Sequence, residues 1–211
     1  MSRFQWRAAA MIVLCAGFTA QAGMVQIQLG GVNIQYAAQT ITDHSPDNVD
    51  PDPLTNATFL VDGAQIGVVN AGVTLDMSIP TVMNIPIGGG TVVSAADGTF
   101  YLSLDGSDFL SLLLNQASVT YIPVTGQINF VFAGAAAVII GQQLPFGVTL
   151  GDPASISYSS QITTGSMTTS GGYLTSFLAA GTGEIQAIPE PASLGLLALG
   201  GLAMLRRRVH G

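Results

Sequence analysis

Apolar and polar residues alternate along residues 25–36. The apolar members are Val25, Ile27, Leu29, Val32, Ile34 and Tyr36, and the residues between them are Gln, Asn and the pair Gly30-Gly31. A period of two is the signature of a strand with one buried face. A two-residue turn at Gly30-Gly31 would pair Leu29 with Val32 and keep all six apolar side chains on one face. The pattern therefore predicts a β-hairpin here.

Short runs rich in β-branched and aromatic residues recur along the chain and predict further strands. They cover residues 58–61, 65–69, 73–79, 99–104, 118–122, 127–132 and 154–163. Asp62-Gly63 and Asp97-Gly98 are turn dipeptides between such runs, and residues 123–126 turn the chain between two more. Residues 108–115 fit either a helix capped by Ser107 or a buried strand.

Many short strands separated by turns predict a mainly β fold. We expect an antiparallel β-sandwich, with a β-barrel or a solenoid as alternatives. No convincing repeat period is present, which disfavours the solenoid. The β-rich domain is expected over residues 23–164. Residues 165–187 are rich in Ser, Thr and Gly and are interpreted partly as a linker.

The N-terminal segment 1–22 has the three parts of a secretory signal. Arg3 and Arg7 precede an apolar run over residues 8–20, and Ala20-Gln21-Ala22 then offers the small-x-small pattern that signal peptidase cleaves. The apolar run is short for a membrane span, which needs about 20 residues. We expect a signal helix, cleavage after Ala22 and a mature chain that begins near Gly23. A buried N-terminal helix is the alternative.

The distribution of charged residues restricts the classes of partner that the protein can bind. Of the 211 residues only 8% are charged, lysine is absent, and all five arginines stand at the two ends of the chain. Residues 23–187 hold ten aspartates and Glu184 with no Lys or Arg, which gives a formal charge of −11. Such a segment has nothing to neutralise phosphate, so nucleic-acid binding is excluded. Cations or cationic surfaces are the electrostatically favoured partners.

The C-terminal segment 188–211 has three parts of its own. Pro189 and Pro191, on either side of Glu190, favour an extended chain that a processing enzyme can admit. Residues 192–205 are apolar, and as a helix they span about 21 Å, less than the roughly 30 Å of a bilayer core. Arg206, Arg207 and Arg208 follow and should stay on the cytoplasmic side.

This C-terminal end resembles the PEP-CTERM sorting signal of exported bacterial proteins. Pro189-Glu190-Pro191 matches its motif, residues 194–205 its short transmembrane helix and Arg206–Arg208 its basic terminus. The resemblance implies an exosortase, a membrane-embedded cysteine transpeptidase, that cuts near the motif. A permanent single-span anchor is the alternative. Some descriptions label the same tail a C-terminal domain of ice-binding proteins.

Candidate chemistry in the middle of the chain is sparse. Asp47, Asp50 and Asp52 lie close enough in one loop to converge on a Ca²⁺ ion, although the loop lacks the spacing of an EF-hand. A solvated acidic loop is the alternative interpretation. The stretch 105–108, with Asp at both ends, is a smaller candidate in which Asp-Gly is usual turn chemistry. Apart from Ca²⁺, no cofactor is expected.

An enzyme is not expected. His44 is the one histidine of the mature segment, no Gly-x-Ser-x-Gly elbow is present, and the one cysteine, Cys15, lies in the signal segment. The sequence therefore predicts an exported surface or matrix structural protein, held briefly in the inner membrane and processed through its tail. The alternative is a surface module that binds Ca²⁺, polysaccharide or ice.

Overall fold

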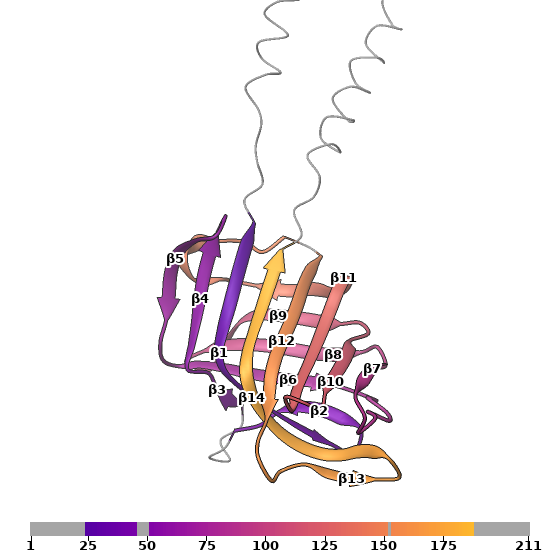
Figure 1. Cartoon of the computed structure of the whole chain (residues 1–211). Coiled ribbons are helices and arrows are strands. Elements are labelled where there is room, and N and C mark those ends of the chain that lie inside the picture. The colour runs from indigo at the N-terminus through magenta and orange to yellow at the C-terminus, as the bar shows by residue number, and fades with distance from the viewer. Residues whose placement is uncertain (1–23, 46–50, 152, 188–211) are drawn as a thin grey trace, which may run out of the picture. The chain divides into compact units, whose positions relative to one another are not determined.

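The computed structural model describes residues 24–45, 51–151 and 153–187, which form one antiparallel sheet of fourteen strands (Figure 1). The strands are β1 (Val25–Ala37), β2 (Thr40–Asp43), β3 (Asp52–Pro53), β4 (Asn56–Val61), β5 (Ala64–Val69), β6 (Val73–Ile79), β7 (Gly90–Val93), β8 (Gly98–Leu104), β9 (Ser107–Leu114), β10 (Ser118–Ile122), β11 (Gln127–Gln142), β12 (Ala154–Ile162), β13 (Thr168–Ser170) and β14 (Tyr173–Ala187). A 3₁₀ turn, η1 (Pro145–Gly147), follows β11.

The predicted signal segment 1–22 and sorting tail 188–211 lie outside the described residues. Among the residues that are described, no helix is both long and apolar enough to cross a bilayer.

The sheet curls so that its pairings return to the strand where they began. They lead from β1 through β2, β6, β8, β9, β11, β12 and β14, and β14 pairs with β1 again. Figure 1 shows β6, β8 and β9 running across the direction of β4, β1, β14 and β12. Buried side chains from both groups of strands form one hydrophobic cluster. The mainly β, antiparallel fold is confirmed, but the strands join in one curled sheet rather than two separate ones.

The predicted hairpin over residues 25–36 is wrong. β1 is a single strand of 13 residues that passes straight through Gly30-Gly31. Its register against β14 shifts between Gly30 and Val32, and Gly31 has a φ of 75°. This is a β-bulge, which inserts one extra residue and changes the phase of the alternation. A bulge and a two-residue turn put the same six apolar residues on one face, so the pattern alone could not separate them.

All seven of the other predicted strands are confirmed, two of them with the same bounds. For residues 108–115 the helix is wrong and the alternative, a buried strand, is confirmed as β9. Asp105 and Gly106 have φ angles of 50° and 80°, which form a tight turn from β8 into β9. Such a turn starts an antiparallel hairpin and leaves no room for a helix N-cap at Ser107.

The predicted linker over residues 165–187 is also corrected. Residues 173–187 form β14, which pairs with β1 on one side and β12 on the other. The glycines of β14 allow the neighbouring strand β12 to pack closely against it. A Cβ at Gly183 would lie 2.5 Å from the ring of Tyr158, and a Cβ at Gly181 would collide with the backbone of Ser159. Glycine-rich composition is typical of linkers, but in this chain it occurs in a strand that is paired on both sides. The β-rich unit therefore continues to Ala187.

Candidate functional site

The acidic candidate is built on Asp52, whose side chain is completely buried at 0% exposure. The backbone N–H of Asn33 donates to Asp52 Oδ2 at 3.0 Å, and the Asn33 amide donates to Asp52 Oδ1 at 3.3 Å. Asp43 lies next to it and accepts from the backbone N–H groups of Asp52 and Met77 at 3.3 and 2.8 Å. These two carboxylates therefore hold β1, β3 and β6 together through backbone donors.

Burial raises the pKa of the Asp52 carboxyl above its ordinary value of 3.8. The hydrogen bonds from Asn33 oppose that rise, the charge of Asp43 adds to it, and His44 lowers it. Desolvation disfavours the charged form of a buried acid, and a like charge nearby does the same. The charged form of Asp52 therefore costs free energy in the folded state. A cation bound beside it would lower that cost.

Two of the three predicted Ca²⁺ ligands, Asp47 and Asp50, lie outside the described residues. Among the residues described, no group of three or more His, Cys, Asp or Glu side chains is arranged to hold a metal ion. The calcium site therefore stays a prediction. The smaller candidate at 105–108 is a turn in which the Ser103 hydroxyl donates to Asp108 Oδ1 at 2.5 Å.

A shallow acidic groove of about 410 Å³ lies on the outer face of β6, β8 and β9. The residues that line it include Pro51, Asp76, Tyr101 and Asp108. Asp76 pairs directly with Tyr101 across the two strands. Two carboxylates beside an aromatic ring suit a cation electrostatically.

A larger polar groove of about 790 Å³ lies on the face of β4, β1, β14, β12 and β11. Gln28 lies opposite Thr58 on one side and Glu184 on the other, and Ser157 lies opposite Glu184 on the next strand. This row crosses four neighbouring strands and presents amide, hydroxyl and carboxylate groups.

A second row of the polar groove runs parallel to the first. Thr182 lies opposite Gly30 and Ser159, and Asn129 lies opposite Ser159. The Asn129 side-chain oxygen is buried and has no hydrogen-bond partner among the described residues. Glu184 is the one charged residue that lines the polar groove. Hydrogen bonding, rather than charge, is the chemistry that this surface offers.

Sequence reasoning missed the polar groove for an identifiable reason. The polar alternation of β1 and β12 is visible in the sequence, with Gln28 on one strand and Ser157 and Ser159 on the other. The strand between them, β14, was interpreted as a linker, so its contributions Thr182 and Glu184 could not be placed in the rows.

The comparisons with known proteins concern the C-terminal end. Residues 187–208 match the family model of the PEP-CTERM protein-sorting motif, a range that contains Pro189, Glu190, Pro191 and Arg206–Arg208. The motif implies exosortase-dependent sorting of an exported protein, with transient membrane anchoring before processing. The searches of curated proteins and of solved structures found no match.

Proposed function

We propose, from the premise that the chain ends in a PEP-CTERM sorting motif, that it is an exported, noncatalytic structural protein of the cell surface or extracellular matrix. The motif match over residues 187–208 carries the proposal. Signal peptidase would cleave after Ala22, and exosortase would cut near Pro189-Glu190-Pro191. The inner membrane would hold the precursor only between these two steps.

The position of the motif supports a structural cargo. β14 is paired with β12 up to Ala187, where the matched range begins. Removal of the tail would therefore leave every strand of the sheet in place. The carboxylates of Asp43 and Asp52 accept hydrogen bonds from backbone N–H groups, which favours a structural over a catalytic role for these two residues.

The sorting step is tested in the producing cell. Replacement of Pro189, Glu190 and Pro191 together by alanine should leave precursor in the inner membrane, because an extended motif is lost. Ser193→Ala, within the matched range but outside the Pro189-Glu190-Pro191 triplet, serves as the matched control and should mature normally. Mass spectrometry of the membrane and external fractions measures both. Normal maturation of the triple variant would refute sorting through this motif, and exported protein that starts at Met1 would refute the signal.

A second candidate function is binding of a neutral polysaccharide in the polar groove. Its two cross-strand rows of Gln, Thr, Ser and Asn match a ligand rich in hydroxyl groups, because amides and hydroxyls both donate and accept hydrogen bonds. The absence of Lys and Arg from residues 23–187 disfavours an anionic glycan.

Affinity electrophoresis of the full chain in gels that contain dextran or galactomannan tests this second function. Wild type should be retarded, and Gln28→Ala combined with Ser157→Ala should migrate as it does without glycan. Thr99→Ala, on the outer face of β8, is the matched control. Equal migration of wild type in all gels would count against neutral-glycan binding and leave the sorting proposal intact.

A further inference from the structure

Most polar side chains of the polar groove make no hydrogen bond with any other described residue. All of them are at least partly exposed, and they come from four neighbouring strands. They are Gln28, Thr58, Ser157, Ser159, Thr182 and Glu184. Their amide, hydroxyl and carboxylate groups are therefore available to water or to a bound molecule.

Polar side chains on other parts of the surface do bond across strands. The hydroxyls of Thr91 on β7 and Thr120 on β10 lie 2.8 Å apart. The hydroxyls of Thr168 on β13 and Thr175 on β14 lie 2.7 Å apart. Cross-strand pairs of this kind are an ordinary way for the surface of a sheet to satisfy its polar groups. The polar groove departs from this arrangement, so its hydrogen-bonding capacity is left for a ligand.

Glu184 stands at the middle of the first row of the polar groove. On one side of it, Gln28 lies opposite on β1 and Thr58 follows on β4. On the other side, Ser157 lies opposite on β12 and Val131 follows on β11. Five strands at a spacing of about 4.8 Å make this row about 19 Å long. A ligand that follows the row therefore meets an amide or a hydroxyl group on each side of one carboxylate.

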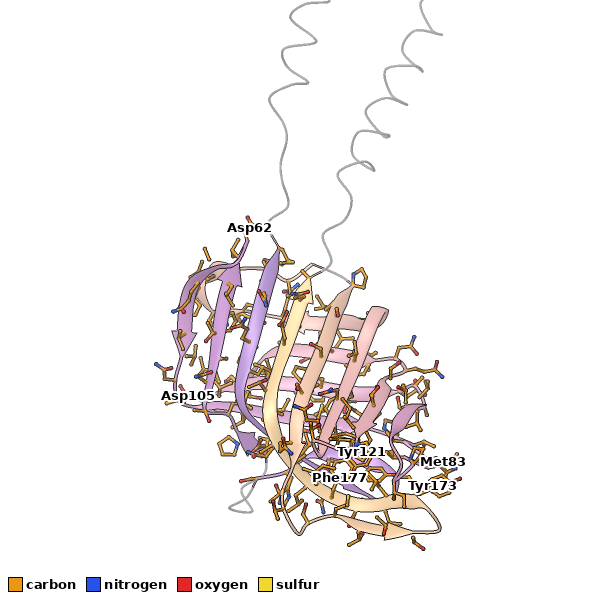
Figure 2. All side chains as sticks on the ribbon, viewed as in Figure 1. Asp62, Met83, Asp105, Tyr121, Tyr173 and Phe177 are labelled. Atoms are coloured by element: carbon orange, nitrogen blue, oxygen red, sulfur yellow. The ribbon has the colours of Figure 1, made fainter. Side chains whose placement is uncertain are left out.

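The charge of Glu184 has no counter-ion in the β-rich part of the chain. Residues 23–187 contain no Lys or Arg and carry a formal −11, and a field of that sign concentrates cations at the surface. Figure 2 shows two other carboxylates, Asp62 and Asp105, at turns on the margin of the sheet. Glu184 instead lies on β14, which is paired on both sides, and it is the one charged residue that lines the polar groove.

These features fit a ligand that carries both hydroxyl and ammonium groups. A hydrogen bond between an ammonium and a carboxylate is stronger than one between neutral groups. A sugar chain with free amines therefore gains more from Glu184 than the same chain with its amines acetylated. We propose that Glu184 makes the polar groove selective for glycans that carry free amino groups. This inference rests on the second candidate function, in which the polar groove binds a glycan, and it adds the residue that sets the preference.

Isothermal titration calorimetry with two matched oligosaccharides tests the preference. The full chain, in a detergent without a sugar headgroup, is titrated at mildly acidic pH with the pentamer of glucosamine and with that of N-acetylglucosamine. Wild type should bind the glucosamine pentamer about fivefold more tightly, which is the upper end of what an exposed ion pair contributes. Glu184→Gln keeps the shape of the side chain and should bind both pentamers equally.

A matched control separates Glu184 from the overall charge of the protein. Asp62→Asn also removes one negative charge, but at an exposed turn outside the polar groove, and it should keep the wild-type preference. Spermine offers ammonium groups without hydroxyl groups, so it should bind wild type at least about tenfold more weakly than the glucosamine pentamer does. Circular dichroism checks that each variant is folded.

The outcomes distinguish this inference from the function on which it rests. Equal binding of the two pentamers by wild type, or an unchanged preference in Glu184→Gln, would overturn the role of Glu184 and leave glycan binding intact. Spermine that binds as tightly as the glucosamine pentamer would mean that the polar groove recognises cations alone, which also overturns the inference. Binding of neither pentamer would overturn it as well, and the gels with dextran or galactomannan then decide the second candidate function separately.

Discussion

Two acidic turns, Asp62-Gly63 and Asp105-Gly106, differ from the exposed apolar side chains of Met83, Ile87, Met167 and Tyr173, which we call the apolar corner, in how their chemistry arises. Asp62-Gly63 and Asp105-Gly106 are two-residue turns, each with both residues at positive φ, and each joins two neighbouring strands. Their charge and their conformation come from the same two residues. The apolar corner is made by segments about 80 residues apart in sequence, joined by the bridge between Pro86 and Tyr173.

This difference shows which surfaces can be recognised from sequence. A short turn carries its signal locally, because Asp and Gly adopt positive φ more readily than other residues. An apolar surface built by distant segments carries no local signal, because exposed Met or Tyr looks the same in sequence as buried Met or Tyr. The charge pattern is the exception, since the lack of charge in both corner segments is visible without a structure.

The largest expected effect comes from breaking β14, the strand that starts at the apolar corner. Gly181→Ala places a Cβ against the backbone of Ser159 and Ser160, which cannot move away as a flexible side chain would. We expect a loss of about 3 kcal/mol in the free energy of unfolding, measured by urea denaturation. Thr182→Ala, the exposed neighbour, should change it by less than about 0.5 kcal/mol. Equal stability of both variants would contradict the central place of β14.

Much of the fold was predictable, because the strands with strict alternation also bury one face. The pattern in residues 73–79 and 118–122 matches β6 and β10 without any shift. The bulge at Gly30-Gly31 was not predictable, since a turn satisfies the same alternation. β14 was not recognised because its glycines are required by close contacts with Tyr158 and Ser159, which belong to another strand. The acidic composition of the Ca²⁺ loop was visible in the sequence, but Asp47 and Asp50 lie outside the described residues.

Calcium binding would stabilise the acidic region of the protein without acting on the apolar corner. If the loop with Asp47, Asp50 and Asp52 binds Ca²⁺ only when folded, a hundredfold excess over the dissociation constant adds about 2.7 kcal/mol of stability. The melting temperature in millimolar Ca²⁺ should then exceed that in NaCl of equal ionic strength. Alanine at Asp47 and Asp50 should remove the excess, whereas Asp62→Asn should keep it. Equal shifts in both salts would identify a solvated loop.

The turn at Asp105 separates the effect of conformation from that of charge. Asp105→Asn removes the charge but keeps a residue that tolerates its φ of 50°, so stability should change by less than about 0.5 kcal/mol. Asp105→Ala loses that tolerance and should cost about 1 kcal/mol. Thermal melts at matched ionic strength measure both. If the two variants lose equal stability, charge rather than backbone conformation governs this turn.

The smallest expected effect is a change in the pH dependence of stability at Asp52. Its pKa in the folded chain is raised above 3.8, mainly because burial disfavours the charged form. The folded state therefore holds the Asp52 proton more tightly than the unfolded state does. The stability that this proton contributes is complete below the unfolded pKa and is lost as the pH rises through the folded pKa. Asp52→Asn cannot titrate, so its free energy of unfolding should fall less than that of wild type between pH 4 and neutrality. Asp62→Asn, at an exposed turn, is the control. Chemical denaturation across this range measures the slope, and parallel curves for Asp52→Asn and wild type would mean that the buried carboxylate of Asp52 does not titrate differently in the folded chain.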